Sequence, residues 1–198
     1  MTATLTAEFA LAIAATLVAG ISRGMLGFGA TLIIVPCLIP LYGPIDTVVI
    51  ASIIEIPAVL YLLPTAVRQA DWRHIAPVGF ASLLTIPVGA FALVSLDPTL
   101  SRHIIAVAVI VFALALSSGW RYHGEPPLAL RIGIGAASGI MGGMANIGGP
   151  LVVMFLVASN KAAAGVRAGI MAFFSISALY RLPVYASFGM YATTSVTL

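Results

Sequence analysis

Eight long apolar runs, separated by short segments with isolated charges, constrain the fold of this chain more than any other feature. They cover roughly residues 5–21, 26–42, 45–67, 75–96, 103–120, 128–140, 147–158 and 164–189. A hydrocarbon layer of about 30 Å takes about 20 apolar residues per helical crossing, so these runs predict membrane helices. Only 8% of the 198 residues are charged, against roughly a quarter in soluble domains. The sequence therefore predicts an all-α, polytopic integral membrane protein with about seven or eight helical segments in one transmembrane domain, residues 1–198.

The few polar residues argue against soluble, catalytic and nucleic-acid-binding functions. The formal net charge is +3, and the charges stand singly between apolar runs, unlike the basic patch of a nucleic-acid-binding protein. His74, His103 and His123 show no metal-ligand spacing, and no enzyme-like combination of nucleophile, base and acid is present. Cys37 is the single cysteine, so no disulfide within the chain can form. We expect no enzymatic activity, no cofactor, no metal site and no nucleic-acid partner.

An internal repeat organises the chain. Sliding the sequence against itself by 119 positions aligns glycine, tyrosine and proline residues without a gap. The aligned pairs include residues 20–25 with 139–144, Gly29 with Gly148, and residues 60–64 with 179–183. Five segments separate the two starts, and an odd number of crossings inverts the second copy. The chain is therefore expected to contain inverted-topology repeats, residues 5–120 and a C-terminally incomplete 128–198, a layout common in secondary transporters.

Lysine and arginine residues are distributed unevenly between the two expected faces of the membrane. If the segments alternate in direction, one face receives seven of them and the other receives only Arg102. The seven are Arg23, Arg68, Arg73, Arg121, Arg131, Lys161 and Arg167. Because cytoplasmic loops are enriched in these residues, the bias predicts that the first face is cytoplasmic and that the N-terminus lies outside.

Two glycine-rich segments, residues 24–31 and 142–150, interrupt the apolar pattern in the two repeats. The flanking runs are too short to cross a membrane and too long when joined, so each break predicts a hairpin of two short helices. Non-helical backbone at membrane depth must be satisfied by protein or water, and the helix after each break presents free N–H groups and the positive end of its dipole. These features predict an anion site, where Thr31 and Asn146 add hydrogen bonds and Pro150 suits a first helical turn.

Close helix packing is the alternative interpretation of the glycines. Four pairs fit the small-x-x-x-small pattern: Gly20 with Gly24, Gly135 with Gly139, Gly139 with Gly143, and Gly165 with Gly169. The breaks recur at repeat-equivalent positions, and paired interrupted segments mark binding sites in transporters with inverted repeats. This recurrence favours the transport-site interpretation.

Ionisable residues inside the apolar runs are further candidates. Glu55 lies among isoleucines, where a carboxylate cannot face lipid, and it is either a proton-coupling group or a structural glutamate paired with a neighbouring helix. Its repeat-equivalent is Phe174, so there is no symmetric carboxylate pair. Arg181 can hold an anionic substrate, neutralise Glu55 or extend to the membrane surface. Arg23 and Arg167 can attract anions, although membrane anchoring explains each of them alone.

Three groups of residues carry a family resemblance: Gly24, Gly27, Gly29 and Pro36 in the first half, the run 143–153 in the second, and residues 166–168. In these positions the sequence resembles the sulfite exporter TauE/SafE family, also called the 4-toluene sulfonate uptake permeases. The resemblance implies an inner-membrane transporter of small sulfur-containing or carboxylated anions, coupled to an ion gradient. It also implies that Gly27, Gly29, Gly148, Gly149 and Pro150 lie near the substrate.

Two features depart from this family. Ala30 and Thr31 stand where members often continue a glycine cluster. The second repeat also ends early, because the 119-residue offset maps Leu198 onto Gly79. A fragment, a truncated chain and a bundle completed by dimerisation are the open explanations.

Together these features predict a secondary transporter (permease) that moves small anions such as sulfite, organosulfonates or related carboxylates across a bacterial inner (plasma) membrane by alternating access. Expected partners are the anionic substrate, the lipid bilayer, a coupling proton or sodium ion, and a second copy of the chain in a homodimer. The alternatives are an anion or solute channel, and a noncatalytic membrane subunit or fragment that requires a partner. The expected substrate-binding residues are Gly27, Phe28, Gly29, Thr31, Asn146, Ile147, Gly148, Gly149 and Pro150, and the expected ion-coupling or charge-partner residues are Glu55, Arg181 and Arg167.

Overall fold

A computed structural model describes residues 13–24, 29–118, 126–157 and 163–193 of the chain, and the regular structure in these ranges is helical throughout. The helices are Ile13–Gly24, α2 (Ala30–Tyr42), α3 (Pro44–Gln69), α4 (Trp72–Ser95), α5 (Pro98–Ser117), α6 (Leu128–Ala145), α7 (Gly149–Val157), α8 (Ala163–Ser187) and α9 (Met190–Thr193). Each of the eight apolar runs corresponds to one of the first eight helices, which confirms the all-α prediction. The short α9 was not expected from the hydropathy pattern.

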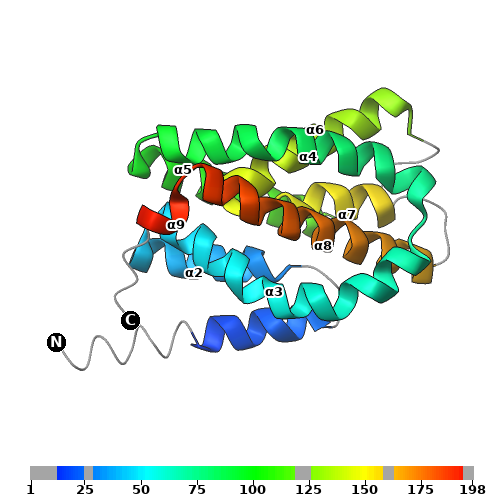
Figure 1. The fold of residues 1–198 in the computed structure, drawn as a ribbon, viewed down its shortest axis with the longest axis horizontal. Helices are drawn as coiled ribbons and strands as arrows, with labels where there is room; N and C mark the ends of the chain where they lie inside the picture. Colours follow the sequence, from blue (N-terminus) through cyan, green and yellow to red (C-terminus); the bar gives the residue numbers. More distant parts are fainter. Residues whose placement is uncertain (1–12, 25–28, 119–125, 158–162, 194–198) are drawn as a thin grey trace.

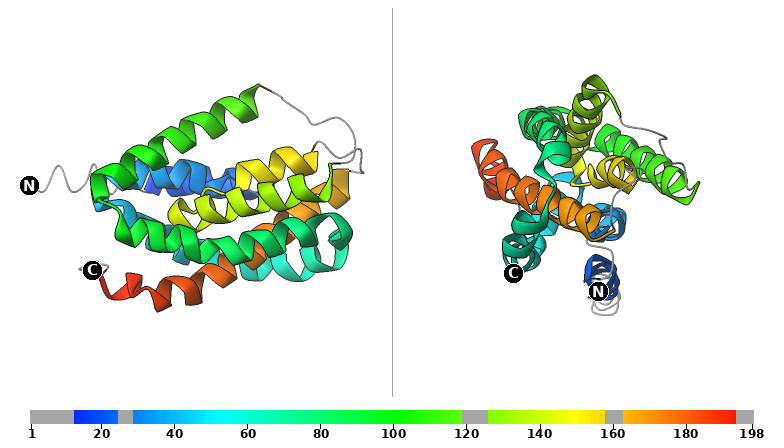
Figure 2. Two further views of the ribbon diagram at one scale, coloured as in Figure 1. Left: turned by 90° about the horizontal axis from the view of Figure 1, so that it is seen from above. Right: turned by 90° about the vertical axis from the view of Figure 1, so that its right-hand side faces the viewer.

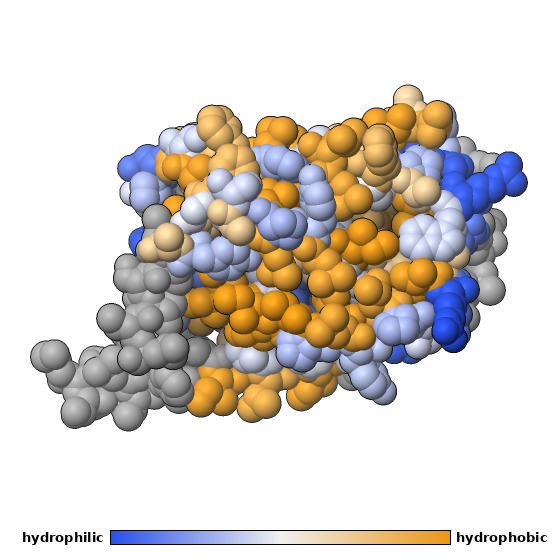
Figure 3. Space-filling model, in the orientation of Figure 1, coloured by the Kyte–Doolittle hydropathy of each residue, from blue (hydrophilic) through white to orange (hydrophobic). Residues whose placement is uncertain are grey.

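Five of these helices, α3, α4, α5, α6 and the Gly165–Ser187 part of α8, are long and apolar enough to cross a membrane. Large hydrophobic side chains cover their outer surfaces, among them Phe80 and Phe91 of α4 and Ile110 and Leu114 of α5. Figure 3 shows hydrophobic residues across the middle of the visible face and hydrophilic ones mainly towards its two ends. An exposed apolar surface of this kind fits a lipid environment, since soluble monomers rarely expose large apolar patches.

Two helix pairs form the body of the bundle: α3 packs along α8, and α4 packs along α6 (Figure 1). In the α4–α6 pair, Gly135, Gly139 and Gly143 of α6 lie directly against backbone atoms of α4, so that a Cβ atom at any of them would clash. The close-packing interpretation is therefore correct for these glycines. By contrast, α5 lies at the periphery and diverges from the other helices in Figure 2, with only Ser101, Ile105 and Phe112 buried.

The described residues of both glycine-rich segments lie between two helices: Ile13–Gly24 precedes α2, with residues 25–28 outside the described ranges, and α6 precedes α7. Gly29 precedes α2 with φ 94°, and Asn146 follows α6 with φ 60°, so both breaks use left-handed backbone, which glycine and asparagine adopt more readily than other residues. Figure 1 shows α2 running towards one end of the molecule and α7 towards the opposite end. The starts of α2 and α7, and those of α3 and α8, are each separated by the 119-residue offset. The assignment of one domain with two inverted repeats stays a prediction, which this spacing supports.

Candidate functional site

A cluster of buried charges lies at the centre of the bundle. Glu55 of α3 accepts hydrogen bonds from Arg23, at 2.5 Å, and from Arg181 of α8, at 3.1 Å. The Asn146 side-chain amide donates to the same carboxylate at 3.4 Å. All four residues are almost inaccessible, with exposed fractions of 6% for Arg23, 5% for Glu55, 4% for Arg181 and 3% for Asn146. We call these four residues the charge cluster.

Four separate segments of the chain supply the charge cluster, and the local structure of each positions its side chain. Arg23 lies next to the end of the helix Ile13–Gly24, and Asn146 occupies the left-handed position between α6 and α7. Glu55 lies on the buried face of α3 that also carries Ser52 and Val59. The cluster therefore joins the first broken hairpin, the second one and the α3–α8 pair, and any relative motion of these elements must rearrange it.

The electrostatic balance of the cluster is positive. Two guanidinium groups face one carboxylate, which leaves one unit of positive charge in a buried setting. In the described residues Arg23 Nε, Arg181 Nε and Asn146 Oδ1 are buried and have no hydrogen-bond partner. A buried polar atom without a partner costs roughly 1–3 kcal/mol, and an uncompensated buried charge costs more. The two arginine Nε–H donors are therefore suited to an additional anionic partner.

A small cavity connects the charge cluster to the start of α7. Its walls come from α4, α6, α7, α8 and the break between α6 and α7, and its lining includes Ser82, Ser138, Gly142, Asn146, Gly148, Gly149, Phe174, Ser177 and Arg181. The free N–H groups at the N-terminus of a helix and its dipole attract negative charge. Arg181 and the start of α7 thus line one space, and both can donate hydrogen bonds to an anion.

The cavity is nearly closed in this structure. Its volume is about 10 Å³, which is close to the minimum for a single water molecule. Phe174 packs on Gly149, where its ring occupies the space that a Cβ atom would need, and Gly148 lies equally close to the backbone of Ser138. Ser138 also donates a 2.7 Å hydrogen bond to the carbonyl oxygen of Gly148. Binding of an anion larger than water therefore requires the walls of the cavity to move apart, including Phe174 against Gly149.

The residues expected at the second break surround this cavity or lie beside it. Asn146, Gly148 and Gly149 line it, while Ile147 and Pro150 are buried next to them. Ile147 belongs to the apolar core, and Pro150 occupies the first turn of α7, as expected. The second break therefore combines polar donors with tight apolar packing.

The residues expected at the first break are placed differently. Gly27 and Phe28 lie outside the described residues. Gly29 is half-buried before α2, and Thr31 is buried in the first turn of that helix, but neither lines the cavity at α7. Arg167 lies on the exposed side of α8 and donates to the carbonyl oxygen of Gly24 at 3.2 Å, so it connects the two halves outside the charge cluster.

Two residues contribute more to this site than the sequence predicts. Arg23 looked like an ordinary membrane anchor, yet it is buried and pairs with Glu55. Tyr185 is fully buried, and its hydroxyl lies 3.2 and 3.0 Å from the carbonyl oxygens of Gly142 and Gly143, to which it can donate. A signal for Tyr185 was available, since it follows Arg181 by one helical turn and shares its face.

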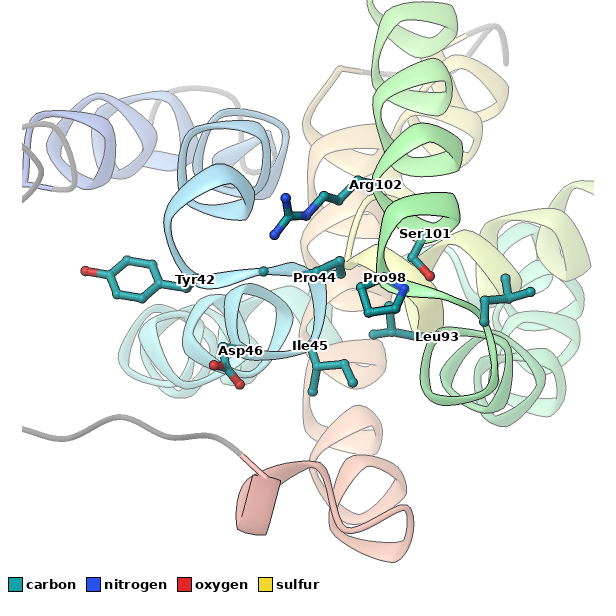
Figure 4. A pocket seen from close by; sticks show the side chains of 10 residues that line it. Tyr42, Pro44, Ile45, Asp46, Leu93, Pro98, Ser101 and Arg102 are labelled. Carbon is teal, nitrogen blue, oxygen red and sulfur yellow. The ribbon is translucent and has the colours of Figure 1, made fainter.

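A second, larger cavity of about 220 Å³ lies where the starts of α3 and α5 meet. Figure 4 shows the Arg102 side chain extending from α5 towards the segment that joins Tyr42 to Pro44, with Asp46 on the other side of that segment. Because Arg102 and Asp46 bring one charge of each sign, this cavity has no excess charge that would favour an anion. It contains none of the residues expected at the substrate site.

The comparisons with known proteins identify the chain. No match to a curated protein or to a solved structure was found. A family model described as "Sulfite exporter TauE/SafE" matches residues 12–198, nearly the whole chain, and confirms the resemblance seen in its glycine-rich segments. With its apolar helices and its two broken hairpins, the protein belongs to the sulfite exporter TauE/SafE family of membrane transporters.

Proposed function

We propose that this protein is a secondary transporter that moves small anions, such as sulfite, an organosulfonate or a related carboxylate, by alternating access. The observation that carries the proposal is the uncompensated positive charge of Arg23, Glu55 and Arg181 beside the N-terminus of α7. Ionisable residues inside a membrane protein are costly, and they commonly mark the pathway of a substrate or an ion. Family membership supports transport, and the chemistry of the donors supports an anion.

The anion is proposed to bind between Arg181 and the start of α7. Arg181 offers its unpartnered Nε–H group, and the first turn of α7 offers backbone N–H groups. Glu55 is already bound to Arg181, so an entering anion competes with its carboxylate for the guanidinium group. This competition lets the site release its anion, since Glu55 can replace the departing charge.

Alternating access is proposed to open the cavity in turn to the two sides of the membrane. The α6–α7 hairpin, α8 and α4 enclose the cavity, and the left-handed backbone at Asn146 provides a place where the hairpin can bend. Transporters of this layout commonly move one repeat against the other around a central site. We further propose a bacterial inner membrane with the N-terminus outside, which places the arginine-rich end in the cytoplasm.

The proposal can be tested by flux into proteoliposomes. Radiolabelled sulfite, sulfoacetate and acetate are supplied with and without a pH gradient, and the wild-type protein is compared with Arg181→Gln. The matched control is Arg102→Gln, which removes an exposed arginine at the second cavity. We expect saturable flux and counterflow in the wild type, near-complete loss in Arg181→Gln, and retention in the control.

Other outcomes separate the competing functions. Conductive flux that shows no counterflow would identify a channel. Flux that appears only when a second protein copurifies would identify a subunit that requires a partner. Undiminished flux in Arg181→Gln would contradict the proposed binding site, because the variant lacks the guanidinium group on which that site depends.

A further inference from the structure

We propose that the charge cluster selects its substrate by charge: a monoanion binds as such, and a dianion binds only together with a proton on Glu55. This inference rests on the proposed function and adds to it the charge class of the substrate and the condition for proton coupling. Its basis is a count of the formal charges in the charge cluster, which reaches the small cavity through Arg181 and Asn146.

The count is made from the groups that contact Glu55. Arg23, from the helix Ile13–Gly24, and Arg181, from α8, form ion pairs with the carboxylate, and Asn146 adds a neutral amide. Tyr185, also on α8, lies close enough to Glu55 and Arg181 to interact with both electrostatically, but its hydroxyl is turned to the carbonyl oxygens of Gly142 and Gly143. Two positive charges and one negative charge therefore leave one positive charge.

Other acidic groups of the described chain do not reduce this charge. Asp46 is in the first turn of α3, about 13 Å along the helix from Glu55 by the rise per residue. Asp71 and Asp97 precede α4 and α5, at the ends of the bundle. A single negative charge in the cavity would thus neutralise the cluster, whereas a double charge would leave it negative.

Because the charge cluster is buried, its net charge after an anion binds strongly affects the free energy of binding. Charges interact much more strongly in a protein interior than in water, and an uncompensated buried charge is costly. A monoanion leaves the loaded site neutral while Glu55 stays ionised. A dianion leaves one negative charge, which protonation of Glu55 removes. The charge of the substrate then determines whether its transport requires a bound proton.

The experiment compares methanesulfonate with sulfate, two tetrahedral anions that share an SO₃ group and differ by one charge. Each is measured in proteoliposomes as a substrate and as a competitor of the anion that the wild type carries. The variants form a charge series: wild type with one excess positive charge, Glu55→Gln with two, and Arg23→Gln/Glu55→Gln with one. Thermal unfolding in detergent checks that every variant is folded.

We expect the wild type to prefer methanesulfonate and to carry it at a rate that does not depend on the pH gradient. Glu55→Gln should shift the preference towards sulfate by about tenfold or more, since one unit of buried charge is worth more than the roughly 1.4 kcal/mol of a tenfold change. The same variant should also abolish any dependence of sulfate flux on the pH of the side from which sulfate enters. The double variant should restore the preference for methanesulfonate.

Two results would overturn the inference while leaving the proposed function intact. One is anion flux in Glu55→Gln with an unchanged ratio of the two anions. The other is a double variant that keeps the preference of Glu55→Gln, because equal charge would then not give equal selectivity. If the single variant does not fold, a double variant whose preference differs from that of the wild type would overturn the inference, because the two carry the same excess charge. Failure of the wild type to move any anion would instead refute the proposed function itself.

Discussion

The two halves of the molecule use the same glycine pattern for different purposes. Gly20 in the first half and Gly139 in the second are equivalent under the 119-residue offset. Gly139 lies against the backbone of Ser82 in α4, whereas a Cβ atom on Gly20 would meet nothing within 4 Å. A repeated sequence motif therefore does not imply a repeated contact, because the neighbours of each copy differ.

The polar residues of the charge cluster differ from the glycines: they lie together in space, but the same residue types do not recur at the equivalent positions of the two repeats. The equivalents of Glu55 and Arg181 are Phe174 and Leu62, and those of Arg23 and Asn146 are Gly142 and Gly27. Each half supplies one arginine and one further polar residue to a single charge cluster. The shared pattern thus shapes the two broken hairpins, and the unshared residues give the site its chemistry.

The largest effect on anion flux should come from replacing one residue of the charge cluster with the residue at the equivalent position of the other repeat. Arg181→Leu copies Leu62 and removes the donor that faces the cavity. Truncation of one partner of a buried charge pair costs about 2–5 kcal/mol, so we expect anion flux to fall by at least about 30-fold. The measurement is kcat/KM for uptake into proteoliposomes. Flux close to that of the wild type would show that the asymmetry of the two halves is not functional.

The next largest effect, on protein stability, should separate alanine substitutions at the two equivalent glycines, Gly139 and Gly20. Gly139→Ala places a methyl group against backbone atoms of α4 that cannot move aside easily, and overpacking of this kind costs about 1–3 kcal/mol or more. Gly20→Ala meets open space and should change the stability of the protein little. Thermal unfolding in detergent measures both variants. Equal destabilisation by the two substitutions would mean that Gly20 has a packing role like that of Gly139.

The sequence predicted the helices well because each is a long apolar run with a clear interruption. The second break was found for the same reason, since glycine clusters and Pro150 disfavour a continuous helix, but the non-helical part is shorter than expected because α6 runs to Ala145 and α7 starts at Gly149. The partner of Glu55 was harder to predict. Arg23 is 32 positions away and sits at a helix end, where positive residues normally anchor a chain to the membrane surface.

The packing around the second break could also not be predicted from the sequence. Phe174 is apolar and carries no chemical signal, yet its ring determines how far the cavity at Gly149 is closed. Contacts of this kind depend on the relative placement of α7 and α8. A periodic pattern along one chain does not contain that information.

A smaller effect is expected at the break itself. Asn146→Gly copies Gly27 and suits the backbone, because glycine adopts φ near 60° without strain. The variant loses only the amide that donates to Glu55, and a hydrogen bond to a charged group contributes about 1.5–3 kcal/mol at good geometry. At 3.4 Å we expect the lower part of that range or less, seen as a several-fold higher KM for the anion.

Asn146→Ala is the matched control for this substitution. It removes the same amide but, unlike Asn146→Gly, keeps a Cβ atom in left-handed backbone, which costs about 1–2 kcal/mol relative to glycine and is no longer offset by the polar side chain that lets asparagine adopt this conformation. We expect a similar KM in both variants and a lower unfolding temperature in Asn146→Ala alone. If Asn146→Gly keeps the wild-type KM, the amide contributes nothing to anion binding, and the second break provides only backbone donors.

The smallest effect should come from an exposed helix start, which differs from the buried breaks in having a side-chain cap. Asp97 accepts hydrogen bonds from the backbone N–H groups of Thr99, at 2.8 Å, and Leu100, at 3.3 Å, whereas α2 begins at Gly29 without such a cap. These two bonds hold the pKa of the Asp97 carboxyl below its usual value of 3.8.

A depressed folded-state pKa stabilises the protein above about pH 4, and this contribution is lost as the pH falls through the folded-state value. Asp97→Asn keeps an acceptor but loses the titration, so its unfolding temperature should lie slightly below that of the wild type at pH 7, and the difference should shrink as the pH falls below about 4. A difference that persists unchanged at low pH would show that the ionised cap does not stabilise the start of α5.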